Sequence, residues 1–165
     1  MSCPDPLANV LLRIAELNAQ QFRASGELPA TLIIGPRRRQ DGFEVLPLEA
    51  ITLRAVQHEI ADACLTITCL EGHLMEQRRD EAGRFPPEPN PDTIADNPDA
   101  RRCYVYLAQA IDGTRACAVQ YVLRPEHGSA TLAPLKILTD HNVAIVDADL
   151  TDLARPGRRA PRSTH

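Results

Sequence analysis

Residues 103–123 read CYVYLAQAIDGTRACAVQYVL, and this stretch decides the expected fold. Two apolar runs, Cys103–Ile111 and Arg115–Leu123, flank the turn residues Asp112-Gly113-Thr114. An Asp-Gly pair between two such runs is typical of a β-hairpin, because glycine adopts the positive φ that a tight turn requires. The stretch therefore predicts two antiparallel strands. A helix from Asn97-Pro98-Asp99 to Gly113 remains an alternative for its first half.

Further apolar runs lie on both sides of this hairpin. Ala130–Leu138 and Val143–Val146 are separated by four polar residues, Thr139-Asp140-His141-Asn142, which predicts a second hairpin. Nearer the N-terminus, Thr31–Ile34 and Phe43–Leu46 enclose Gly-Pro and Asp-Gly turn signals, with three arginines at the expected tip. The pattern is typical of a mostly antiparallel sheet.

The N-terminal segment has the periodicity of a helix. Pro4 and Pro6 suit a helix start, and Gly26 suits its end. Apolar residues recur at three- and four-residue spacing, as one stripe formed by Leu7, Val10, Leu11, Ile14 and Leu17. We expect this stripe to dock on one face of the sheet.

Residues 48–80 fit two descriptions. Leu48–Ala63 approximates a helical stripe, whereas residues 65–69 alternate with β-branched side chains, as a strand does. We predict a helix over Leu48–Ala63 followed by a strand to about Leu70. A single helix through the whole stretch stays open.

The length and composition favour one domain with an aliphatic core. The chain has 165 residues, of which 44% are hydrophobic and 4% aromatic, and it lacks tryptophan. We expect an α+β fold with one or two helices packed on a mostly antiparallel sheet of about five to six strands. The domain spans residues 1–153 and includes a proline-rich loop at 84–99. Residues 154–165 have nothing to bury and predict a disordered, arginine-rich tail.

Several whole-chain features predict a soluble, cytoplasmic protein. No stretch has the length and hydrophobicity of a signal peptide core or a membrane span, so no membrane partner is expected. The five cysteines are an odd number without zinc-site spacing, which favours reduced, buried thiols. Lys136 is the only lysine among 18 basic residues, a bias typical of a GC-rich, bacterial-like genome.

One short motif suggests a metal site. His58-Glu59-Ile60-Ala61-Asp62 resembles the zinc-binding helix motif of the zincins, with Asp62 where that motif has its second histidine. On a helix, His58 and Asp62 lie one turn apart, Glu59 is placed to polarise a bound water, and His73 is a possible third ligand. The alternative is the solvated face of an amphipathic helix, which needs no metal. No cofactor is therefore expected, with zinc as the alternative.

An acidic segment offers a weaker metal hypothesis. Asp147, Asp149 and Asp152 follow an apolar run, and carboxylates at a strand end can hold Mg²⁺ against phosphates. No glycine-rich phosphate loop accompanies them. A solvated strand exit explains the same residues.

Clustered arginines suggest contact with a partner or with nucleic acid. One cluster is Arg37, Arg38 and Arg39, and the other lies in the tail and comprises Arg155, Arg158, Arg159 and Arg162. The net charge of −4 provides no global attraction for phosphate backbones, and scarce aromatic residues provide few surfaces for base stacking. A solvated hairpin tip and a disordered end are the simpler interpretations.

No complete catalytic constellation is visible in the chain. We therefore expect a non-catalytic interaction or accessory protein that binds a protein partner. Two alternatives stay open: a metal-dependent hydrolase using the His-Glu-x-x-Asp segment, and a nucleic-acid accessory factor using the arginine clusters.

Overall fold

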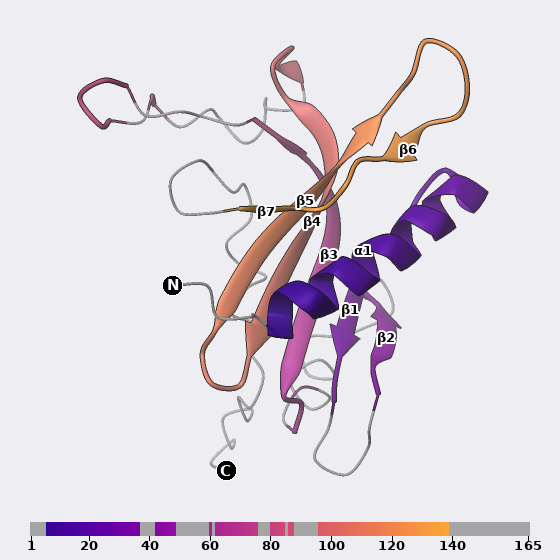
Figure 1. The fold of residues 1–165 in the computed structure, drawn as a ribbon, viewed down its shortest axis with the longest axis vertical. Helices are drawn as coiled ribbons and strands as arrows, with labels where there is room; N and C mark the ends of the chain where they lie inside the picture. Colours follow the sequence, from indigo (N-terminus) through magenta and orange to yellow (C-terminus); the bar gives the residue numbers. More distant parts are fainter. Residues whose placement is uncertain are drawn as a thin grey trace, which may run out of the picture.

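The computed structural model describes residues 6–36, 42–48, 60, 62–75, 80–84, 86–87 and 96–138. In chain order the elements are α1 (Pro6–Ser25), β1 (Thr31–Ile34), β2 (Glu44–Pro47), β3 (Leu65–Leu74), β4 (Arg101–Ala110), β5 (Arg115–Leu123), β6 (Thr131–Leu132) and β7 (Lys136–Leu138). Within the described part, one helix thus packs against an antiparallel sheet, as an α+β fold requires (Figure 1).

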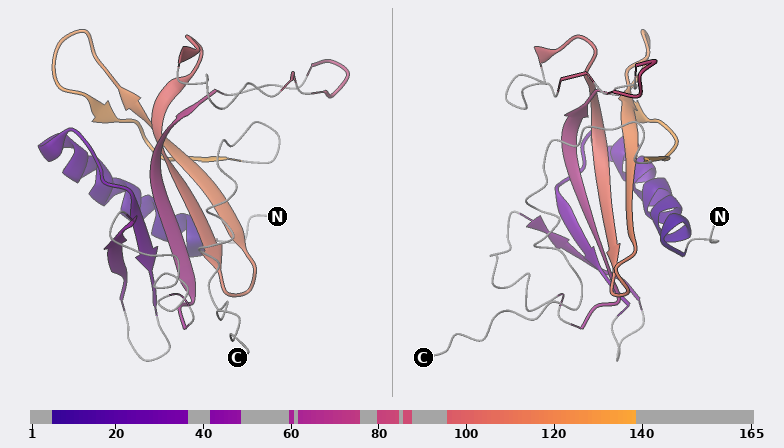
Figure 2. Two further views of the ribbon diagram at one scale, coloured as in Figure 1. Left: turned by 180° about the vertical axis from the view of Figure 1, so that it is seen from behind. Right: turned by 90° about the vertical axis from the view of Figure 1, so that its left-hand side faces the viewer.

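The sheet is arranged in the order β2-β1-β3-β4-β5-β6, and β7 pairs with another part of β5. Every pairing is antiparallel. In the register, Cys69 of β3 lies opposite Tyr106 of β4, which lies opposite Ala118 of β5. Helix α1 lies against one face of the sheet, and the long strands of the sheet are curled (Figure 2).

Helix α1 forms where the apolar periodicity predicts it. Leu7, Leu11 and Phe22 are buried against the sheet, and these positions share one side of a 3.6-residue helix. The helix ends at Ser25, and the next residue, Gly26, has a φ of 78°, which places it in the left-handed region. The Gly26 N–H donates to the Phe22 carbonyl at 2.7 Å, which satisfies one of the last carbonyls of the helix.

Two aromatic residues of β4 anchor the layer between α1 and the sheet. Tyr104 and Tyr106 are fully buried, and the Phe22 ring meets the Tyr104 ring edge-to-face with centroids 5.8 Å apart. Two smaller clusters lie on the opposite face of the sheet. One comprises Leu32, Ile34, Ile60 and Ala63. The other comprises Leu74, Cys103, Val119 and Tyr121. Packing on both faces explains why burial runs through the first half of β3 and most of the second half of β4.

The predicted hairpins are confirmed at residues 31–47 and 101–123. The helical alternative for 97–113 is wrong, because Arg101–Ala110 is a strand that pairs on both sides. Strand β3 continues past Leu70 to Leu74. The single run expected at 130–138 is two short strands, separated at Pro134, whose missing N–H interrupts a ladder. The described sheet therefore has seven strands rather than five or six.

Other predictions lie outside the described residues. They concern most of the second helix (49–59), much of the proline-rich loop (88–95), the strand at Val143–Val146 and the tail (154–165). Within the described part, no helix combines the length and hydrophobicity that crossing a bilayer requires.

Candidate functional site

A groove of about 430 Å³ runs between α1 and the β1–β2 hairpin. Its volume lies in the range of ligand-binding pockets, which spans roughly 300–1,000 Å³. The lining residues come from one side of α1, from the segment before β1, from the two strands, and from Phe43 just before β2. They are Val10, Arg13, Ile14, Leu17, Asn18, Gln21, Leu28, Pro29, Thr31, Ile33, Phe43 and Val45.

The rim of the groove presents large apolar side chains to solvent. Leu17 is 64% exposed, Val45 59% and Phe43 49%, although each belongs to a regular pattern of apolar residues. The N-terminal stripe was expected to dock on the sheet, but its member Leu17 stays largely exposed and lines the groove instead. Clustered exposed apolar residues are typical of binding surfaces in folded proteins.

The groove also has a sparse set of polar groups. Arg13, Asn18, Gln21 and Thr31 line it, and the described lining contains no carboxylate. Asn18 Nδ2 donates a hydrogen bond to the Tyr106 hydroxyl at 2.9 Å. Apolar walls with a few placed polar groups are the usual composition of a binding site.

A buried polar chain beneath the groove ties α1 to the sheet. The Tyr106 hydroxyl donates to Gln120 Oε1 at 2.5 Å, and Gln120 Nε2 donates to the carbonyls of Ala133 at 3.1 Å and Ala15 at 3.4 Å. Burial is the main reason that the pKa of Tyr106 is raised, so its hydroxyl stays protonated and able to donate. This chain holds one wall of the groove in place.

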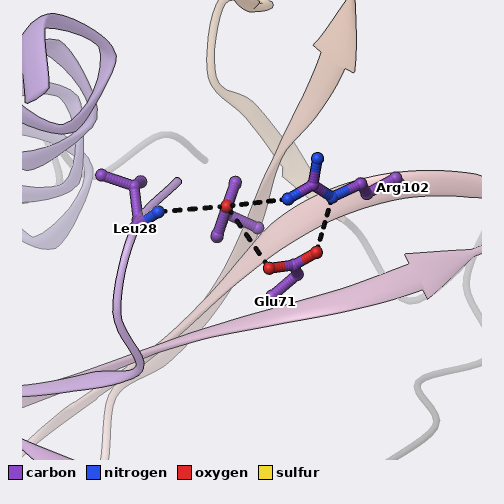
Figure 3. Close-up of polar contacts among 4 residues, drawn as sticks. Leu28, Glu71 and Arg102 are labelled. Atoms are coloured by element: carbon purple, nitrogen blue, oxygen red, sulfur yellow. Dashed lines mark hydrogen bonds and ion pairs between the residues drawn. The ribbon is translucent and has the colours of Figure 1, made fainter. Parts of the chain in front are cut away.

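A second polar cluster secures the segment that leads from α1 into β1 (Figure 3). The Leu28 N–H donates to the Tyr104 hydroxyl at 3.2 Å, and that hydroxyl donates to Glu71 Oε2 at 3.4 Å. Arg102 Nε donates to Glu71 Oε1 at 2.5 Å. The Arg102 bond is the main cause that lowers the pKa of Glu71, and the same bond raises the pKa of Arg102. The Glu71 carboxylate thus forms a structural ion pair with Arg102.

Three of the described thiols are unsuited to nucleophilic chemistry. Burial raises the pKa of Cys69 and of Cys103 to about 12, and that of Cys117 to about 11. Because the thiolate is the nucleophile and the metal ligand, these side chains are inert near neutral pH. Cys69 and Cys103 are buried, as expected of small core hydrophobes.

The residues proposed for a metal site are placed as follows. Asp62 is exposed and precedes β3, whereas His73 lies near the far end of that strand and opposite Arg102. On the order of 25 Å of extended strand separates Leu65 from His73. Asp62 and His73 are therefore not brought together, and His58 and Glu59 lie outside the described residues. Within the described ranges, no group of three or more His, Cys, Asp or Glu residues could hold a metal ion.

The arginine clusters Arg37–Arg39 and Arg155–Arg162 lie outside the described residues, as does the acidic segment 147–152. Among the described arginines, Arg84 pairs with Asp80, and two arginines of β4 also have defined partners. Arg102 pairs with Glu71, and the Arg101 guanidinium lies 4.0 Å from the centre of the Tyr121 ring. Nucleic-acid binding through the arginine clusters stays a prediction.

The groove was not anticipated from the sequence. Leu17, Phe43 and Val45 each fit an element's apolar pattern, and such patterns ordinarily indicate core positions.

No known family, characterised protein or solved structure matches the chain significantly.

Proposed function

We propose that the chain is a non-catalytic interaction protein, and that the groove between α1 and the β1–β2 hairpin holds part of a protein partner. The observation that carries the proposal is the apolar groove itself, with Leu17, Phe43 and Val45 exposed at its rim. Side chains of this size lower the free energy when they leave water, by about 25 cal/mol per Å² of apolar surface.

The chemistry of the lining also supports binding rather than catalysis. The described lining contains no histidine, cysteine or carboxylate that could serve as a nucleophile or a general base. The wall formed by α1 is held by the bond from Asn18 to Tyr106 and by the buried Tyr106–Gln120 bond, so this side of the groove is formed before a partner arrives. Preformed surfaces lose less conformational entropy on binding.

The experiment compares two substitutions on the same helix. Tagged wild-type protein, Leu17→Glu and Leu12→Glu are each used to purify partners from the native cell, with quantitative mass spectrometry. Leu12 is also exposed, at 48%, but does not line the groove, so it controls for adding a charge to α1. Both variants should keep the wild-type thermal unfolding midpoint, because exposed substitutions rarely change stability by more than about 0.5 kcal/mol.

We expect a stoichiometric protein that is recovered with wild type and Leu12→Glu but lost with Leu17→Glu. Equal recovery with all three proteins would exclude the groove as the binding surface. Recovery of the chain alone would count against the interaction function itself.

A further inference from the structure

Strand β2 stands at one end of the sheet, and among the described residues no further strand pairs with its outer side. The sheet order ends at β2, whose neighbour is β1 (Figure 1). Leu48 N–H donates to the Ala30 carbonyl at 3.0 Å, so residues 44, 46 and 48 direct their backbone bonds toward β1. The intervening Val45, opposite Ile33, therefore directs its N–H and carbonyl to the outer edge.

The β1–β3 register confirms this alternation. Gly35 N–H donates to the Leu65 carbonyl at 3.0 Å, so Thr31 and Ile33 bond with β3 and Leu32 bonds with β2. An antiparallel ladder alternates in this way without exception unless a bulge intervenes. The outward direction of the Val45 backbone thus follows from two independent hydrogen bonds.

The side chains beside this edge face the groove. Phe43 and Val45 both line it, and Pro47 lacks the N–H that a longer ladder would need. Natural edge strands are usually protected by charge, proline or coverage, since an open edge pairs with other chains. At β2 the proline limits pairing to the Val45 side of the strand, where the apolar residues are exposed.

The charge of the lining adds a requirement for the occupant. Among the described lining residues, Arg13 is the one charged side chain, and no carboxylate lies beside it in the groove. A partner that carries an acidic group at this point gains a favourable ion pair, and a basic group there is repelled.

We propose that the partner enters as an extended segment that adds a strand to the outer edge of β2. The segment bonds with the N–H and carbonyl of Val45, and places apolar side chains at alternate positions in the groove. An acidic side chain in the same segment pairs with Arg13. The inference rests on the proposed function, because it specifies how the groove is occupied; β-strand addition is an established mode of peptide recognition.

The first step of the test is a selection. A displayed library of random twelve-residue peptides is panned against the full chain, and enriched peptides are synthesised with a fluorescent label. Anisotropy then gives their dissociation constants. We expect apolar residues at every second position and one acidic residue. Enrichment of helical three- and four-residue spacing, or of no peptide, would overturn the proposal.

The second step tests the backbone contact. Val45→Pro removes the outward N–H while leaving every β1–β2 bond, and Val45→Thr keeps both the N–H and a β-branched side chain. We expect Val45→Pro to weaken binding about tenfold or more, through the lost hydrogen bond and the carbonyl left unpaired on the peptide. Val45→Thr should change it less than threefold. Equal affinities of the two variants would refute strand addition.

Methylation of the peptide backbone provides the same test without altering the protein. A methyl group on the nitrogen that bonds to the Val45 carbonyl should abolish binding, whereas methylation of the adjacent nitrogen, which faces away, should not. Arg13→Gln should weaken the binding of the acidic peptide. The affinity of the same peptide with its Glu replaced by Gln should not change. Equal loss at both nitrogens would contradict the register.

These outcomes separate the two proposals. Peptide binding that is lost with Leu17→Glu but unaffected by Val45→Pro and by methylation would retain the groove and reject strand addition. Binding indifferent to all the substitutions would reject both. A final experiment titrates the protein with dodecanoate, a small amphiphile. If dodecanoate binds in the groove and the library yields no peptide, the occupant is a small amphiphile and the proposal of strand addition is rejected.

Discussion

The Tyr106 hydroxyl of β4 donates a 2.5 Å hydrogen bond to Gln120 Oε1 of β5, and both side chains are almost completely buried. The two residues are diagonal neighbours on the sheet face that α1 covers. Asn18 of α1 donates to the same hydroxyl, so one phenol connects the helix with two strands. A buried polar group with two such partners stabilises a specific arrangement, since any other packing leaves it unsatisfied.

Replacing Tyr106 with phenylalanine should destabilise the fold. The change leaves Gln120 Oε1 and Asn18 Nδ2 without this partner, and an unsatisfied buried group costs about 1–3 kcal/mol. Urea unfolding of Tyr106→Phe, Asn18→Ala and the double variant measures the coupling. We expect an interaction energy above about 0.5 kcal/mol, and strictly additive effects would show that the network is not cooperative.

The ion pair between Glu71 and Arg102 predicts a pH-dependent contribution to stability. Arg102 lowers the pKa of Glu71 below its usual value of 4.5 in the folded state. The contribution is therefore present above the unfolded-state pKa and is lost as the pH falls through the lower folded-state pKa. Because the Glu71 side chain is 43% exposed, the expected size at pH 7 is about 0.5–1 kcal/mol.

Urea unfolding of wild type and Glu71→Gln at pH values from about 2.5 to 7 checks this prediction, because carboxylates titrate within roughly this range. The two curves should converge in acid. Glu126→Gln, a change at an exposed carboxylate after β5, serves as the control. A stability difference between wild type and Glu71→Gln that persists unchanged at the acid end would contradict the assignment.

Gly35 is required at the end of β1. Its φ is 145°, and an added Cβ would lie 2.3 Å from the Gly42 carbonyl oxygen, at the base of the β1–β2 hairpin. We expect Gly35→Ala to cost about 1–3 kcal/mol through backbone strain and a forced shift of the hairpin. Gly72→Ala in β3 is the matched control, because its Cβ meets nothing within 4 Å. Similar unfolding midpoints for the two variants would disprove the steric requirement.

The thiols of the sheet should resist alkylation in the folded protein. Burial raises the pKa of Cys69 and Cys103 to about 12, so little thiolate exists at pH 8. Iodoacetamide labelling followed by peptide mass spectrometry should show both sites protected in the native state and modified after urea unfolding. Rapid native labelling of Cys69 would mean that α1 opens readily from the sheet.

Elements with strong local signals were predictable from the sequence. Helix α1 follows from its apolar period and Gly26, and the β4–β5 hairpin follows from Asp112-Gly113 between two apolar runs. The division of 130–138 into β6 and β7 was missed, although Pro134 was a visible signal. The extension of β3 to Leu74 was missed because Glu71, Gly72 and His73 lack β propensity, and pairing with β4 compensates for it.

The candidate groove could not be predicted in the same way. The sequence by itself determined which segments form helix and strands, because turn residues and apolar periodicity act over a few neighbouring positions. Only the tertiary structure decided that β1 lies between β2 and β3, and that α1 leaves Leu17 beside Phe43 and Val45 instead of burying it. Those outcomes depend on packing between residues far apart in the chain, where the buried Tyr104 and Tyr106 set how α1 rests on the sheet.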